Sequence, residues 1–308
     1  MSRGVDRLGP LGRYSSVSDR IAKSVIGAYS TSFGLATRLL GPRHRDHVRN
    51  IYALVRVADE LVDGVAAEAG VSADQQRRML DELEAETESG MRLGYSSNPI
   101  IHAFARTARA SGFGAELTRP FFASMRTDLQ LTPSDPQITE AAEQVGFGPD
   151  DHADYVYGSA EVVGLMCLRI FIRDEDCSSD RERRLVHGAR SLGAAFQNVN
   201  FLRDLGDDTQ RLGRSYLSET GTVSARAKER WIDSIREQLD AAAQTIPLLP
   251  GDARLAVLCA LRLFSALTDR LAVVPAAELP RRRIRVAGPH KAALVLRSMY
   301  EVRQGVKR

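Results

Sequence analysis

The sequence predicts an all-α protein that forms a single helical domain. The chain has 308 residues, of which 44% are hydrophobic, so it is long enough to bury one large core. No shift in composition divides it, and apolar residues recur at helical spacing along most of its length. We expect a flexible tail over residues 1–16, which are rich in Gly, Ser and Arg, and one all-helical domain over 17–308.

Capping residues, glycine and proline bound the expected helices. Ser18 or Asp19 caps the first helix, which runs to Leu40 and ends at Gly41-Pro42. Residues 131–151 contain three prolines and two glycines and predict a surface loop. The remaining helices are expected at about 43–65, 73–89, 98–110, 115–129, 155–172, 180–210, 225–246, 252–273 and 289–303.

A polar stripe on an apolar helix is the first functional signal. Tyr52, Arg56, Asp59 and Asp63 recur at i, i+4, i+7 and i+11, which places them on one face. Two carboxylates one helical turn apart repel each other by roughly 0.2–0.5 kcal/mol, and by more when they are desolvated. A buried helix does not keep such a pair for stability, so a bound cation is expected.

A second stripe repeats this design. Gln197, Asn200, Asp204 and Asp208 recur at i, i+3, i+7 and i+11. Facing carboxylate pairs would make an all-oxygen site, which suits Mg²⁺ ions that keep several waters and take further ligands from substrate phosphates. Arg56 and Arg203 could hold the same phosphates. A lone DxxxD is usually a solvated helix face, but two on apolar helices with arginines nearby favour a functional site.

Composition excludes several other classes. The net charge of +3 comes from mixed charges, and only 6% of residues are aromatic, so no nucleic-acid partner is expected. The three cysteines lack metal-ligand spacing and predict reduced thiols in a cytoplasmic protein. We expect no signal peptide or transmembrane span. The absence of a P-loop, a Ser/His/Asp set and a dinucleotide fingerprint disfavours kinases, hydrolases and dehydrogenases.

Together, the two stripes resemble the squalene/phytoene synthase family, the head-to-head prenyl synthases. Ser30-x-Ser32-Phe33 upstream and Tyr155–Phe171 between the stripes support the resemblance, which extends to Lys291. It implies a helical bundle of the isoprenoid synthase type with a central apolar cavity. It also implies Mg²⁺ as the cofactor, with Mn²⁺ as a substitute.

The resemblance assigns roles to individual residues. The implied metal ligands are Asp59, Asp63, Asp204 and Asp208. The implied catalytic residues are Tyr52, Arg56, Tyr155, Gln197, Asn200 and Arg203. The implied substrate-binding residues are Ser30, Ser32, Phe33, Arg214, Tyr216, Arg283 and Lys291. The sequence departs from the family pattern at Glu161, where a small residue is usual, at Ser218 in place of Pro, and at Phe264 in place of Tyr.

The activity implied is that of phytoene synthase. Two geranylgeranyl diphosphates condense head to head through a cyclopropyl diphosphate, and phytoene forms without a reductant. The first alternative is squalene or presqualene diphosphate synthesis from farnesyl diphosphate, with NADPH for squalene. A class I terpene cyclase and a catalytically silent scaffold of the same fold are further alternatives, and the four intact aspartates disfavour the scaffold.

Two further expectations concern the surroundings of the site. Gly158 and Gly164 are expected to bend their helix or to leave room for a long apolar ligand. The basic segment Leu279–Lys291, next to an apolar helix, could contact anionic lipid, so peripheral membrane association is expected as well.

Overall fold

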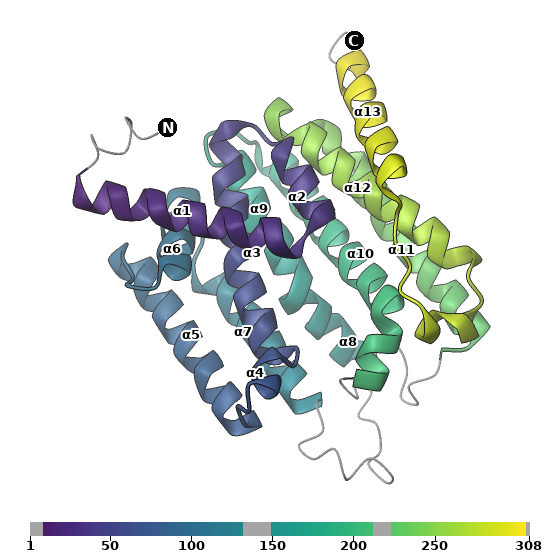
Figure 1. Cartoon of the computed structure of the whole chain (residues 1–308). Coiled ribbons are helices and arrows are strands. Elements are labelled where there is room, and N and C mark those ends of the chain that lie inside the picture. Colours follow the sequence, from purple (N-terminus) through teal and green to yellow (C-terminus); the bar gives the residue numbers. More distant parts are fainter. Residues whose placement is uncertain (1–8, 132–148, 212–222, 306–308) are drawn as a thin grey trace.

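The computed structural model of the chain describes residues 9–131, 149–211 and 223–305. All regular elements in these ranges are helical, which confirms the predicted all-α class (Figure 1). In chain order they are α1 (Pro10–Tyr29), α2 (Thr31–Arg38), α3 (Pro42–Val62), α4 (Val65–Glu68), α5 (Ala73–Leu93), α6 (Pro99–Ser111), α7 (Ala115–Leu131), α8 (Pro149–Val156), the π-helical turn η3 (Tyr157–Glu161), α9 (Val162–Ile172), α10 (Ser179–Arg211), α11 (Ala225–Thr245), the short 3₁₀ turn η4 (Ile246–Leu248), α12 (Gly251–Val273), the 3₁₀ turn η5 (Ala276–Arg281) and α13 (Gly288–Gly305).

The N-terminal segment is more ordered than the sequence suggested. Pro10 opens α1, so the prediction of a flexible tail is wrong for residues 10–16. The Tyr14 hydroxyl donates to the Ser97 carbonyl at 2.7 Å, and the Ser15 hydroxyl lies 2.9 Å from Nε2 of His102 on α6. These contacts with residues more than 80 positions away hold the first turns of α1, and local composition could not reveal them.

The expected helix from residue 18 to Leu40 is two helices. Ser30 interrupts it with an extended backbone (φ −135°, ψ 114°) and caps α2, its hydroxyl accepting from the Phe33 N–H at 3.0 Å. The break turns α2 so that it contacts both α3 and α12 (Figure 1). Most of the expected 131–151 loop lies outside the described residues, and Pro149 to Asp151 begin α8.

Two apolar clusters form the core. One gathers side chains of α3, α6, α7 and α9, including the buried rings of Phe104, Phe121 and Phe122. The other gathers side chains of α10, α11 and α12, among them Leu202 and Ile235. Burying a side chain of this size stabilises the fold by about 1.5–3 kcal/mol. The orientation of each long helix is therefore set by its apolar face.

The stretch Asp151–Ile172 is long and apolar enough, by length and composition, to cross a membrane, with a mean hydropathy of 1.4 in its most apolar window. In the structure, 56% of that window is buried inside the protein. The helix packs against α3, α7 and α10, which accounts for its apolar composition.

Glycines in this stretch allow close packing of helices. A Cβ at Gly158 would lie 2.3 Å from the Pro120 carbonyl oxygen, and one at Gly164 would lie 2.5 Å from that of Ala189. The backbone of neighbouring helices thus fills the space beside these glycines, where room for a ligand was one expectation. The expected irregularity of the helix is present as the π-helical turn η3.

We predict that stability falls as the pH drops from about 6.5 towards 4. Nδ1 of His47 lies 2.9 Å from the Thr107 hydroxyl, and burial lowers the pKa of His47 to about 4. In this pH window, His47 becomes protonated in the unfolded chain but stays neutral in the folded protein. The stability that neutral, buried His47 contributes is therefore fully present above the window and is lost as the pH falls through it. Thermal unfolding at several pH values should show a shallower decline for His47→Asn than for the wild type. The exposed control His290→Asn should keep the wild-type slope, and an unchanged slope in His47→Asn would contradict the prediction.

Candidate functional site

The first predicted stripe lies on α3, and none of its four side chains is fully exposed. Tyr52, Arg56, Asp59 and Asp63 are all half-buried. The guanidinium of Arg56 stacks over the Tyr29 ring at 4.5 Å. Because the other faces of α3 bury residues such as Ala53 and Ala58 in the core, the stripe cannot rotate outwards without unpacking the helix.

The second stripe lies on α10. Gln197, Asn200 and Asp204 are half-buried, and Oδ1 of Asn200 is buried without a hydrogen-bond partner among the described residues. Two guanidiniums contact the Asp204 carboxylate, because Nε of Arg203 and Nε of Arg283 each lie 2.9 Å from Oδ1. The backbone of Asp208 continues α10, but its side chain lies outside the described part of the structure.

Aromatic rings connect the two stripes. Phe33 lies on α2, and its ring centroid is 6.4 Å from that of Tyr52 on α3 and 5.5 Å from that of Phe196 on α10. Phe196 in turn stacks on Phe264 of α12 at 3.8 Å. Phe264 stands where the family commonly has Tyr, and its place in this stack accounts for an apolar ring. The beginning of the first stripe therefore faces α10 across a shared aromatic cluster.

Ser30 joins this cluster through Tyr52. Its hydroxyl caps α2 and lies close to the Tyr52 side chain. Burial raises the pKa of Tyr52, an effect that the nearby Arg56 opposes. The phenol is therefore a neutral hydrogen-bonding group at physiological pH.

Two predicted substrate-binding cations lie beside predicted site residues that are distant in the sequence. Lys291 reaches the start of α2, with Nζ 2.9 Å from Oγ1 of Thr31, between Ser30 and Ser32. Arg283 contacts Asp204, as described above. The structure thus places Lys291 beside the start of α2 and Arg283 beside the second stripe. Arg214 and Tyr216 lie outside the described residues.

The structure also adds a residue that sequence reasoning missed. The Tyr155 hydroxyl donates to both carboxylate oxygens of Asp128, at 2.8 and 2.9 Å. Asp128 lies on α7 and is only 3% exposed. An acid on the apolar face of an amphipathic helix was the signal that could have revealed it. Glu161, the other unexplained acid, accepts from Nε of Arg190 at 2.6 Å.

The available donors fit a divalent cation by their chemistry. In the described part of the chain, no three His, Cys, Asp or Glu side chains gather closely enough to hold an ion alone. The oxygen donors of Asp59, Asp63, Asn200 and Asp204 come from two helices instead. Such sparse hard ligands suit Mg²⁺, which takes its other ligands from water and phosphate. That these residues bind metal stays a prediction.

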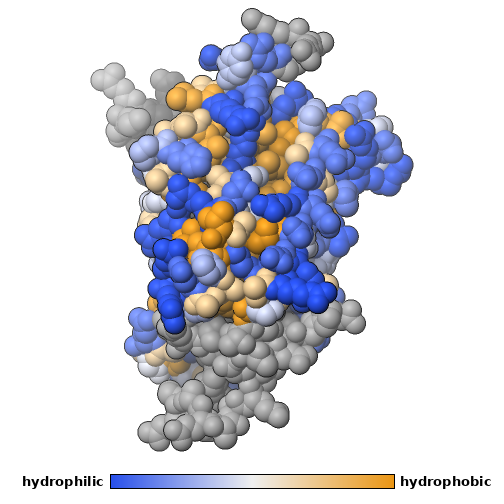
Figure 2. All heavy atoms as spheres, turned by 90° about the vertical axis from the view of Figure 1, so that its right-hand side faces the viewer, coloured by the Kyte–Doolittle hydropathy of each residue, from blue (hydrophilic) through white to orange (hydrophobic). Residues whose placement is uncertain are grey.

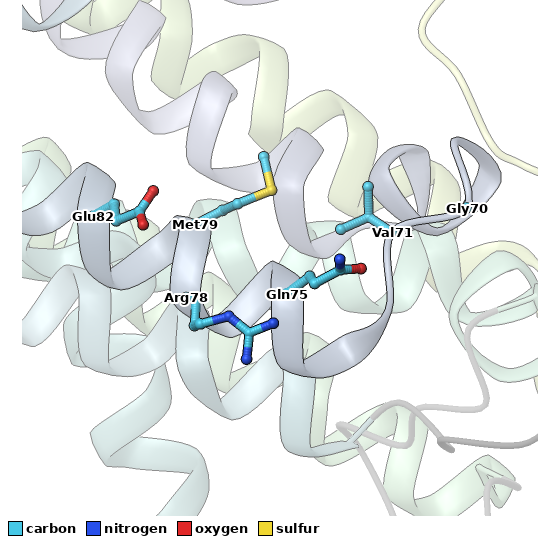
Figure 3. Close-up of a pocket in the computed structure, with 6 residues that line it drawn as sticks. All are labelled: Gly70, Val71, Gln75, Arg78, Met79 and Glu82. Carbon is cyan, nitrogen blue, oxygen red and sulfur yellow. The ribbon is translucent and has the colours of Figure 1, made fainter.

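The surface pocket in Figure 3 is separate from these residues. It is lined by the turn after α4 and by the first turns of α5, including Val71, Gln75 and Met79. None of the predicted site residues lines it. The pocket is therefore not part of the candidate site, and the central apolar cavity stays a prediction.

The fold and the paired stripes define a helical bundle of the isoprenoid synthase type. The chain belongs to the squalene/phytoene synthase family, whose sequence profile matches residues 26–289. It is therefore a prenyltransferase of the phytoene/squalene synthase type.

Named relatives fall within the same family. A phytoene synthase of Arthrospira platensis is 27% identical over 280 residues, covering 83% of this chain and 84% of the relative. A 15-cis-phytoene synthase of Paracoccus is 32% identical over 190 residues, covering 61% of this chain and 56% of the relative.

Solved structures confirm the fold. A dehydrosqualene synthase in complex with a ligand superposes with a TM-score of 0.70 at 21% identity, covering 97% of this chain and 99% of that one. A squalene synthase from Alicyclobacillus acidocaldarius gives 0.64 at 16% identity, covering 88% and 97%.

We predict that Ser30 and Ser32 differ in their effect on stability. Ser30→Ala removes the cap of α2 and should cost about 1 kcal/mol. Ser32→Ala leaves this cap in place and should keep the free energy of unfolding within about 0.5 kcal/mol of the wild type. Denaturant unfolding measures both, and equal stabilities would contradict the structural role of Ser30.

Proposed function

We propose that the protein is a phytoene synthase that condenses two geranylgeranyl diphosphates head to head. The observation that carries the proposal is the pair of half-buried carboxylate stripes on α3 and α10, with Arg203, Arg283 and Lys291 nearby. Relatives named phytoene synthase, one of them matched over 83% of the chain, favour the geranylgeranyl substrate.

Asp59 and Asp63 from α3, with Asn200, Asp204 and Asp208 from α10, would hold Mg²⁺ together with a substrate diphosphate. When bound there, Mg²⁺ would supply positive charge to offset the charge that develops on the departing diphosphate. Arg203 and Arg283 add forked donors for the same oxygens. Lys291 and the start of α2 would receive the diphosphate of the second substrate.

In the proposed reaction, the carbon–oxygen bond of one substrate breaks, diphosphate leaves, and an allylic cation remains. The double bond of the second chain attacks this cation, loses a proton and closes a cyclopropyl diphosphate. A second loss of diphosphate, rearrangement and loss of a proton give phytoene. The rings of Phe33, Phe196 and Phe264 would exclude water from the cations.

The decisive assay supplies purified protein and Mg²⁺ with either geranylgeranyl or farnesyl diphosphate, each with and without NADPH, and identifies the hydrocarbons formed. Phytoene that does not depend on NADPH is the expected result. Squalene or presqualene diphosphate from the farnesyl substrate would replace the proposal with the first alternative. A cyclic terpene would indicate a cyclase, and no turnover of either substrate would favour a scaffold.

We predict that Asp59→Asn and Asp204→Asn each lower kcat by roughly 10²–10³-fold, because each removes a ligand for the ion that stabilises the leaving group. Neither variant should unfold. Asp59→Asn relieves repulsion with Asp63, whereas Asp204→Asn loses ion pairs worth about 0–1 kcal/mol each. Asp46→Asn, at an exposed position on α3, is the matched control and should keep wild-type kinetics. Near wild-type rates in Asp59→Asn or Asp204→Asn would count against the proposal.

We also propose that the protein is cytoplasmic and contacts membranes through its C-terminal basic face. Arg281 ends η5, Arg285 lies in the segment that leads to α13, and both are exposed. On α13, Leu296 (67%) and Tyr300 (64%) are exposed as well. Figure 2 views the side of the molecule that carries α13, where apolar and hydrophilic residues intermingle.

Sedimentation with vesicles measures this contact. Binding should require anionic phospholipid and should fall roughly 10-fold or more when Arg281 and Arg285 are both replaced by Ala, at about 1 kcal/mol per cation. Arg230→Ala, at an exposed position on α11, is the control. Equal binding to neutral vesicles would contradict the electrostatic contact.

A further inference from the structure

Asp128 is the only carboxylate among the fully buried side chains of the described residues. Moving a carboxylate out of water has an effective cost of several kcal/mol, so its position calls for a physical reason. Its two oxygens accept the hydroxyl of Tyr155, which is itself only 6% exposed. The contact joins α7 to α8 across 27 residues of sequence.

The face of α7 around Asp128 is shaped to receive Tyr155. Pro120, Ser124 and Asp128 follow one another at i, i+4 and i+8 and therefore share a stripe. The Ser124 hydroxyl donates to the Tyr155 backbone carbonyl at 3.1 Å. Gly158 lies against the same stripe, because a Cβ there would be 2.2 Å from Oγ of Ser124. Two hydrogen bonds and one close approach thus fix Tyr155 in place.

Tyr155 also packs against α10, the helix of the second stripe. Its ring centroid lies 5.9 Å from that of Phe201, which follows Asn200 on α10. The π-helical turn η3 begins two residues after Tyr155, and π-helical turns are frequent at functional sites. The Asp128–Tyr155 pair therefore packs against α10, the helix that carries the second stripe.

We propose that Asp128 is a positioning residue that holds the phenol of Tyr155 with its O–H donated to the carboxylate. The inference rests on the proposed function. A phenol has a single proton, so towards any other neighbour this oxygen acts only as an acceptor. The carboxylate also polarises the oxygen and makes it more negative. Such an oxygen stabilises a nearby allylic cation and cannot donate a hydrogen bond to a diphosphate.

The test is a double-mutant cycle with Asp128→Asn, Tyr155→Phe and the combined variant. kcat, KM and the thermal midpoint are measured for each. Asp128→Asn keeps the shape of the side chain but removes its charge, so we expect kcat to fall roughly 10²-fold while KM stays within about 2-fold. The combined variant should be no slower than Tyr155→Phe, because Asp128 acts through the phenol. Tyr14→Phe removes a distant tyrosine hydroxyl as the control and should keep the wild-type kcat.

A lowered thermal midpoint with wild-type kcat in Asp128→Asn would show a purely structural pair and overturn the inference. Independent, multiplying losses of kcat in the combined variant would overturn it as well. If Asp128→Asn fails to fold, Asp128→Ser supplies the same cycle with a smaller neutral acceptor.

The kinetics use whichever diphosphate the wild type converts. Squalene formation would therefore refute the proposed function, but the double-mutant cycle would still test the role of Asp128. A wild type that converts neither substrate overturns both.

Discussion

Acidic side chains are half-buried on helices whose other faces form the core, and this arrangement limits how the helices can be oriented. On α3, the apolar residues Ala53, Leu54 and Ala58 are almost completely buried. Each large side chain in such a core contributes about 1.5–3 kcal/mol, whereas repulsion between neighbouring aspartates costs a few tenths. Packing of the apolar residues therefore determines which way Asp59 and Asp63 face. The repulsion between the two carboxylates is too weak to change that orientation.

The electrostatic arrangement around the second stripe follows the same order. Asp204 is 19% exposed and is met by the guanidiniums of Arg203 and Arg283. Arg203 is its neighbour in sequence, whereas Arg283 arrives from the segment between η5 and α13. Helical periodicity determines the face of α10 on which the Asp204 carboxylate lies. Only the folded structure shows that Arg283, from a later segment, contacts it. The basic segment thus reaches the second stripe through Arg283, while Arg281 and Arg285 are exposed.

The sequence was sufficient to predict the features that depend on helical periodicity. The long helices, both stripes and the apolar faces behind them follow from spacing alone. The break at Ser30 could not be predicted this way, because no glycine or proline marks it. The extended backbone at Ser30 lets α2 contact α3 and α12, and α12 is distant in the sequence. Asp128 was missed for the same reason, since its partner lies on a different helix.

Glycines in the α8 to α9 region show a related limit of sequence reasoning. A missing side chain is compatible with a cavity or with a close neighbour, and only the fold distinguishes them. Gly158 and Gly164 each face a carbonyl of another helix. Glu161, which stands where the family usually has a small residue, is likewise explained only by the fold, because its carboxylate accepts a hydrogen bond from Arg190. The Arg190 guanidinium also lies over the Tyr157 ring at 5.2 Å.

The position of α2 has a consequence for how the polypeptide folds during synthesis. Phe33 meets rings at positions 196 and 264, and Thr31 meets Lys291. These partners leave the ribosome long after α2 does, and contacts of such large sequence separation form slowly. The helix α2 can thus meet α3 early in synthesis, whereas its contacts with α10, α12 and Lys291 form only after those later segments have been translated.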